Sequence, residues 1–372
     1  MCGALSCCKG RGLPVLRRTG HIAFSCCLLL PTAQAQEKDA RICYERIAID
    51  HVSIAPKMEA QVRNGEPINL QRTTRRELGH VPGSSRTFSI EYLPIPARLL
   101  AGWTLKPFKG RTGLLHWDAQ TYQQESLLGF IGIHQADKVI TIAFRGSVSL
   151  YDFANNLNMG VVRSKLIPYP GYLHDGYHSI FEAMLPDFEA LWQEAVADLP
   201  DLEAYTFVVT GYSLGGSLAT LMASYLITQP AYRSYLRRDN VRLILFAAPS
   251  VGFRYKKNDF SRWLGARIQY IKRFERMTDM APQVSHLAKL RWREGSWRQL
   301  YTPLTPAPVG VCVTLPNYGD SVLNFYQAHR LSKYRRGVYE SLGLTYTPLS
   351  FGVVYKASVK RTKSATDSAS GR

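Results

Sequence analysis

The residues best suited to chemistry lie at positions 205–216, YTFVVTGYSLGG, where a β-branched and aromatic run ends in a Gly-x-Ser-x-Gly pentapeptide. Ser213 is the central residue of this pentapeptide. Serine nucleophiles of acyl transfer have this spacing because they sit on a strained turn between a strand and a helix. Side chains two residues before or after the serine would collide with backbone, which Gly211 and Gly215 avoid. The pattern predicts that Ser213 attacks a carbonyl carbon.

A serine nucleophile needs a base to take its proton and an acid to hold that base. On strand-turn-helix scaffolds of this kind the three residues follow the order serine, acid, histidine. Two histidines follow Ser213 in the chain, His286 and His329. We predict His329 as the base because it follows the last expected strand, and His286 remains the alternative. Asp279 is the predicted acid because it lies in the loop after an expected strand, where the carboxyl edge of a sheet carries functional groups.

The oxyanion of the tetrahedral intermediate needs two backbone N–H donors. One comes from the residue after the nucleophile and the other from a loop after an earlier strand. Leu214 takes the first role by its position. The segment Phe144-Arg145-Gly146-Ser147 ends an apolar run. The amide of Ser147 is therefore the predicted second donor, and its hydroxyl could reinforce the geometry.

The elements that must position these residues alternate between strand and helix patterns. Residues 129–134 and 139–144 predict a hairpin, and residues 180–196 have helical apolar spacing. The nucleophile strand and a helix over residues 215–227 follow. Further strands are expected at residues 241–247, 267–274 and 309–315. This alternation predicts an α/β fold with a mainly parallel central sheet flanked by helices.

Taken together, these motifs resemble the fungal-type class 3 lipases. The resemblance rests on the Ser147 and Ser213 segments, the stretch His174-Asp175-Gly176-Tyr177, the Asp279 loop and His329, in that order. It also extends to the segment 247–252 that precedes the acid. The resemblance implies an α/β-hydrolase fold, lipase or esterase activity, and the catalytic and oxyanion roles named above.

The resemblance also implies a mobile lid after the oxyanion loop. Leu150, Phe153 and Leu157 share one helical face there, and this amphipathic spacing fits either a lid or an ordinary helix packed on the core. The family often has tryptophan where this chain has Phe153. Substrate preference therefore stays open at this position.

The expected function is hydrolysis of acylglycerol esters by a Ser-His-Asp acyl-enzyme mechanism, that is, a triacylglycerol lipase. A phospholipase A1 or a non-lipid serine esterase is the alternative, and a catalytically silent protein that binds membranes or polyanions is a further one. No metal-ligand spacing of cysteine and histidine occurs, so neither a metal nor another cofactor is expected.

Composition divides the chain into four expected parts. Residues 1–35 have a basic start, an apolar stretch at 22–30 and the small-residue site Ala33-Gln34-Ala35, a pattern typical of a signal peptide for a secreted or periplasmic protein. An uncleaved anchor or a misassigned start codon are the alternatives. Residues 36–94 are expected to be irregular, residues 95–350 to form the catalytic domain, and residues 351–372 to be a disordered basic tail.

The chain is strongly basic, with a formal net charge of +18. Its basic clusters fit an anionic membrane surface or an ordinary solvated face, and no nucleic-acid-binding signature accompanies them. After removal of the leader, Cys43 and Cys312 remain. They could form one disulfide or stay as two thiols. The oligomeric state is not indicated by the sequence.

Overall fold

A computed structural model describes most of the chain. The described residues are 33–80, 86–117, 120–147, 160–282, 290–293, 296–299, 305–318, 328–344, 346 and 356–359. The chain divides into a first unit, Met1–Ala40, of which only the start of one helix is described, and a second unit, Arg41–Arg372. All that follows concerns the second unit, which includes that helix from Arg41 onward.

Seven described strands form the central sheet, in the order β16-β12-β9-β8-β5-β4-β3. Five of them are parallel, from β5 to β16, and β4 pairs antiparallel with both β5 and β3. Their bounds are Trp103–Trp117 (β3), Gln120–His134 (β4), Val139–Phe144 (β5), Thr206–Tyr212 (β8), Val241–Phe246 (β9), Tyr270–Arg276 (β12) and Val311–Leu315 (β16). The predicted hairpin and the predicted parallel sheet are confirmed.

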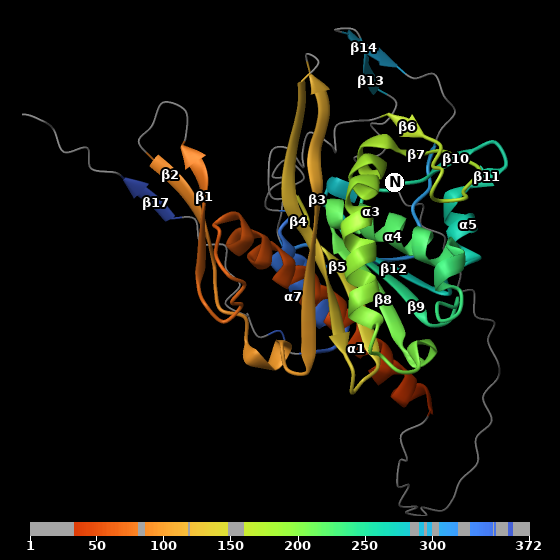
Figure 1. Cartoon of the computed structure of the whole chain (residues 1–372), viewed down its shortest axis with the longest axis horizontal. Coiled ribbons are helices and arrows are strands. Elements are labelled where there is room, and N and C mark those ends of the chain that lie inside the picture. The colour runs from red at the N-terminus through yellow and green to blue at the C-terminus, as the bar shows by residue number, and fades with distance from the viewer. Residues whose placement is uncertain are drawn as a thin grey trace, which may run out of the picture. The chain divides into compact units, whose positions relative to one another are not determined.

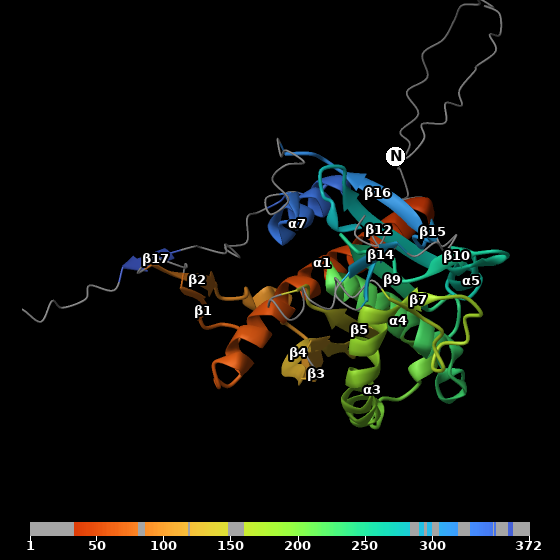
Figure 2. The ribbon, with the colours of Figure 1, turned by 90° about the horizontal axis from the view of Figure 1, so that it is seen from above.

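Helices cover both faces of this sheet (Figures 1 and 2). Helices α3 (Asp175–Val196) and α4 (Leu214–Thr228) lie on one face, and α1 (Ala33–Arg63) and α7 (Leu331–Ser341) lie on the other. Alternate residues of each strand supply the two cores: Phe207 and Val209 pack with α3 and α4, whereas Val208 packs with α1 and α7. Strand residues buried on both faces form near-continuous apolar runs, as in β5. The molecule has the α/β-hydrolase fold that the motifs predicted.

The expectation that residues 36–94 are irregular was wrong. Helix α1 runs through the first half of this range, and β1 (Thr74–His80) and β2 (Arg86–Tyr92) occupy much of the second half. The apolar side of α1 is fully buried, for example Ile49 and Val52 against the sheet. Burying each such side chain contributes roughly 1.5 to 3 kcal/mol, so α1 is part of the catalytic domain's core.

Smaller elements surround the main sheet. Strands β1, β2 and β17 (Lys356–Val359) form an antiparallel sheet. The expectation that residues 351–372 form a disordered tail was therefore wrong for the residues of β17. Beside it are the groups β10-β11-β15, β13-β14 and β6-β7. The remaining bounds are Val161–Val162 (β6), Leu173–His174 (β7), Phe253–Tyr255 (β10), Asn258–Asp259 (β11), Leu290–Arg293 (β13), Ser296–Gln299 (β14), Thr305–Pro306 (β15), helix α5 (Phe260–Gly265) and the 3₁₀ turns Ala97–Leu99, Leu202–Ala204 and Pro230–Tyr232.

Several predictions fall outside the described residues: the leader up to residue 32, the alternative base His286, and the lid residues Leu150, Phe153 and Leu157. Cys312 is described, and it is a free, exposed thiol on β16 rather than half of a disulfide. Among the described helices, none combines the length and the apolar character that a membrane span requires.

Candidate active site

Ser213 lies at the sharp turn between β8 and α4. Its φ of +55° is a left-handed conformation that costs a non-glycine residue about 1 to 3 kcal/mol. The turn is held by the bond from the Ser213 amide to the Phe246 carbonyl and by the bond from the Gly216 amide to the Ser213 carbonyl. A Cβ atom at Gly211 would lie 2.0 Å from the Gly215 carbonyl oxygen, so the collision predicted from the pentapeptide is real. The serine is 7% exposed at the carboxyl edge of the sheet.

The structure brings Ser213, His329 and Asp279 into one hydrogen-bonded chain. Nε2 of His329 lies 2.8 Å from Ser213 Oγ, and Nδ1 of His329 lies 2.7 Å from Asp279 Oδ2. The Asp279 side chain is fully buried, and the His329 ring is 16% exposed. With Nδ1–H donated to the carboxylate, Nε2 can accept the serine proton, which is the geometry that general-base activation of a hydroxyl requires.

Tyr334 is a further partner of the acid, contributed by α7. Its hydroxyl donates to Asp279 Oδ2 over 2.7 Å and accepts from the Arg276 amide. The other oxygen, Oδ1, accepts from the Ala281 amide. Burial, together with the negative charge of Asp279, raises the pKa of Tyr334 well above its ordinary value. The hydroxyl therefore stays protonated and keeps donating to the carboxylate.

The loop that carries His329 is fixed through its backbone. Arg276, at the end of β12, donates from Nη1 to the Ala328 carbonyl over 2.6 Å and from Nε to the Pro316 carbonyl. The hydroxyl of Tyr212 donates to the carbonyl of His329, and its ring stacks on the imidazole with a centroid distance of 4.9 Å. The residue directly before the nucleophile therefore also orients the base.

The predicted oxyanion donors lie on two segments that touch. Leu214 is the first residue of α4, and Ser147 lies just beyond the end of β5. A Cβ atom at Gly215 would lie 2.3 Å from the Arg145 carbonyl oxygen, so the first turn of α4 is in direct contact with the loop that leads to Ser147. Their two amides thus come from adjoining backbone, as an oxyanion site requires.

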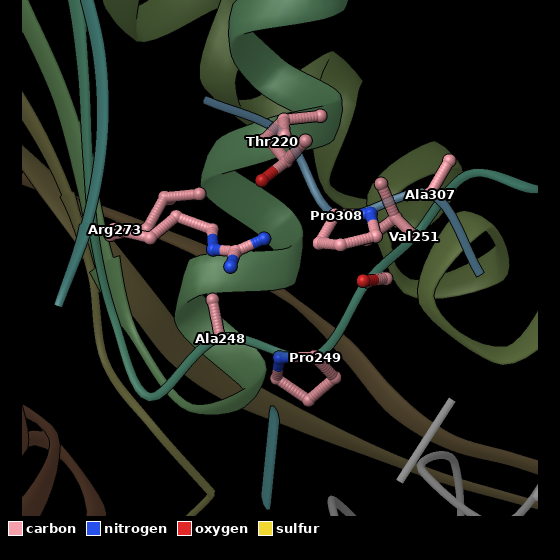
Figure 3. A pocket seen from close by; sticks show the side chains of 10 residues that line it. Thr220, Ala248, Pro249, Val251, Arg273, Ala307 and Pro308 are labelled. Atoms are coloured by element: carbon pink, nitrogen blue, oxygen red, sulfur yellow. The ribbon is translucent and has the colours of Figure 1, made fainter. Parts of the chain in front are cut away.

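A small cavity lies beside α4 and is lined by Thr220, Arg273 and the segment after β9 (Figure 3). Its volume of about 10 Å³ accommodates roughly one water molecule, and none of Ser213, His329 and Asp279 lines it. It is too small for an ester substrate. Within the described ranges no cluster of three or more potential metal ligands occurs, and the expectation of a cofactor-free site stays a prediction.

Sequence reasoning missed Arg276 and Tyr334. Both lie in polar, basic stretches, and Tyr334 belongs to the segment KYRR. In that same stretch Arg335 is only 3% exposed and pairs with Asp50 of α1, so part of the expected basic surface is interior. The one usable signal was position, because Arg276 and Asp279 lie within one turn at the same strand end.

Part of the chain is similar to a known protein family. The model of the family "Lipase (class 3)" matches residues 141–289. The secreted mono- and diacylglycerol lipase 1 of Fusarium solani is 26% identical over 193 residues, which cover 50% of this chain and 53% of that protein. Phospholipase A1-II 1 of Oryza sativa subsp. indica is 22% identical over 152 residues, covering 35% of this chain and 38% of the rice protein. The chain thus spans about half the length, or less, of these relatives.

Among solved structures, the Rhizomucor miehei lipase propeptide complex is similar to this chain. The TM-score is 0.43 at 18% sequence identity, and the superposition covers 66% of this chain and 63% of that one.

Proposed function

We propose that this chain, whose residues 141–289 match the class 3 lipase family model, hydrolyses acylglycerol esters through an acyl-enzyme on Ser213. The observation that carries the proposal is the hydrogen-bonded chain from Ser213 through His329 to a fully buried Asp279. The Fusarium solani relative, named a mono- and diacylglycerol lipase, supports the substrate class.

The proposed mechanism follows from the distances. His329 takes the Ser213 proton through Nε2 as Oγ attacks the ester carbonyl, and Asp279 holds the imidazole in the tautomer that makes this transfer possible. The amides of Ser147 and Leu214 stabilise the oxyanion. The proton then passes from His329 to the leaving alcohol, and water activated by the same base releases the fatty acid.

Export and surface attraction complete the proposal. The Fusarium solani relative is named a secreted lipase, and residues 1–35 have the pattern of a cleaved leader. N-terminal sequencing of the mature protein tests this, and a mature chain that still begins at Met1 would contradict it.

The exposed side chains of Arg233, Arg237 and Arg238 could attract anionic lipid. Salt-dependent sedimentation with vesicles containing phosphatidylserine, against vesicles of phosphatidylcholine alone, tests that attraction.

The decisive experiment labels the protein with a fluorophosphonate and maps the labelled peptide in wild type and in Ser213→Ala. We expect the label on Ser213 alone and no labelling of the variant. Label on a different serine, or persistent labelling of Ser213→Ala, would overturn the site assignment. Release of fatty acid is then compared on emulsified diacylglycerol, phosphatidylcholine and a soluble short-chain ester. Hydrolysis of phosphatidylcholine alone would replace the acylglycerol assignment by phospholipase A1 activity. Hydrolysis of the soluble ester alone would replace it by non-lipid esterase activity.

A further inference from the structure

Arg145, in the loop that leads to Ser147, has its whole side chain inside the protein. It is 1% exposed, and its guanidinium donates to the Leu127 carbonyl, to the Gly146 carbonyl over 2.8 Å, and to the hydroxyl of Ser126. Its amide donates to the carbonyl of Leu128. The loop after β5 therefore lies beside residues 126–128 of β4, and the hydrogen bonds of Arg145 connect the loop to that strand.

The Ser126 hydroxyl that Arg145 contacts is in turn bound by Glu59 of α1. Glu59 is 1% exposed, and its carboxylate accepts from the Ser126 hydroxyl over 3.1 Å and from the Leu127 amide over 2.8 Å. Arg63, one turn further along α1, donates to the same carboxylate. Ser126 thus lies between the two groups: its hydroxyl accepts from the guanidinium of Arg145 and donates to the carboxylate of Glu59.

The nucleophile turn holds the opposite side of the same loop. A Cβ atom at Gly146 would lie 2.8 Å from the ring of Tyr212, and one at Gly215 would lie 2.3 Å from the Arg145 carbonyl oxygen. The loop is therefore fitted between the Ser213 turn and the Ser126–Arg145 contact. A shift of the guanidinium would change the position of the backbone that carries the Ser147 amide relative to Ser213.

We infer that Glu59 is a positioning residue for the oxyanion site: through Ser126 and Arg145 it fixes the loop that presents the Ser147 amide. The inference rests on the proposed function, because it presumes that Ser147 donates to an oxyanion. Pre-oriented donors stabilise charge that develops only in the transition state, so loosening them lowers kcat and leaves substrate binding nearly unchanged.

Glu59→Gln tests this, because it keeps the shape and one acceptor oxygen but removes the charge. The matched control is Glu45→Gln, which also removes a 1% exposed carboxylate from α1, one bound instead to Tyr270 and Lys272 on β12. On a soluble short-chain ester we expect kcat of Glu59→Gln to fall by about 10-fold to 100-fold with KM changed less than about twofold, and kcat of Glu45→Gln to stay within about threefold of wild type. Affinity for a boronic acid, which forms a tetrahedral adduct on the serine, should fall in parallel with kcat.

Ser126→Ala is the milder second variant, in case Glu59→Gln does not fold. It removes only the hydroxyl between Glu59 and Arg145, and we expect kcat to fall by about threefold to tenfold. If both variants fold, as monitored by urea unfolding, and keep the kcat and boronic acid affinity of Glu45→Gln, the inference is overturned. A wild type that neither hydrolyses esters nor takes the fluorophosphonate would overturn the proposed function as well, so the two failures are distinguishable.

Discussion

The hydroxyl of Tyr334 gives the sharpest test of how the acid is held. Tyr334→Phe keeps the buried ring, which packs edge-on against Tyr212, and removes only the oxygen that donates to Asp279 and accepts from the Arg276 amide. The buried Asp279 carboxylate then loses one of its three described hydrogen bonds, the others coming from His329 and Ala281. We therefore expect slower catalysis and lower stability.

The magnitude follows from the charge of the acceptor. A hydrogen bond to a charged group contributes about 1.5 to 3 kcal/mol, and each 1.4 kcal/mol corresponds to a factor of ten. If the whole contribution acted on the transition state, kcat would fall by up to about 100-fold; the remaining bonds retain part of the orientation, so about tenfold is expected. Tyr334 is fully buried and cannot touch substrate, so KM should not change. The orphaned Arg276 amide should lower the free energy of unfolding by about 1 to 3 kcal/mol.

Tyr339→Phe is the matched control on the same helix. Its hydroxyl contacts Asp50 and Arg335 and no member of the Ser213 chain, so its loss should affect stability without slowing catalysis. Steady-state kinetics on a soluble ester and urea unfolding of both variants provide the comparison. Equal kcat for Tyr334→Phe and Tyr339→Phe, or a loss confined to KM, would refute the argument that Tyr334 acts through Asp279.

Two further changes test the turn and one buried histidine, His174. Gly215→Ala brings a Cβ atom to 2.3 Å from the Arg145 carbonyl oxygen and should lower kcat by about 100-fold or more. The control is Gly265→Ala, whose Cβ meets nothing within 4 Å and which should leave kcat unchanged. Similar kcat values for the two variants would contradict the close contact. Burial lowers the pKa of His174 to about 3, so below pH 6.5 the unfolded chain takes up a proton that the folded chain does not, and stability falls as the pH falls. Between pH 7.5 and pH 4.5 the free energy of unfolding, measured by urea titration, should fall by roughly 3 kcal/mol because of this histidine. His174→Phe should remove that part of the pH dependence of stability. An unchanged pH dependence would show that other groups cause it.

The nucleophile and its scaffold were predictable because local rules determine them. A glycine-flanked serine after an apolar run demands a strand, a sharp turn and a helix, and the structure has β8, Ser213 and α4 in that order. The parallel sheet followed from alternating strand and helix patterns. The pairing of Asp279 with His329 was a prediction from chain order, and the structure puts their side chains 2.7 Å apart.

The residues that hold Asp279 and His329 in place were not predictable, because their roles arise from partners that are distant in the sequence. Arg276 and Tyr334 sit in polar stretches, and nothing local distinguishes a tyrosine that donates to a buried carboxylate from one on the surface. Tertiary context decides, since the two residues are separated by the whole of β16 and by segments outside the described part of the chain. Helix α1 was missed for the same reason.

Helix α1 has charged residues at buried positions, and that is why its pattern does not indicate a core helix. Each buried charge has a partner from another segment: Asp50 pairs with Arg335 of α7, and Glu59 accepts from Ser126, which in turn bonds Arg145. Deleting residues 36–94 would leave Arg335, which is 3% exposed, without the Asp50 carboxylate, and would leave Ser126 without the carboxylate that accepts its hydrogen bond. Breaking one buried ion pair costs about 3 to 5 kcal/mol, a large share of the stability of a typical domain, about 5 to 15 kcal/mol. The catalytic domain therefore begins within α1, before Asp50, rather than at residue 95.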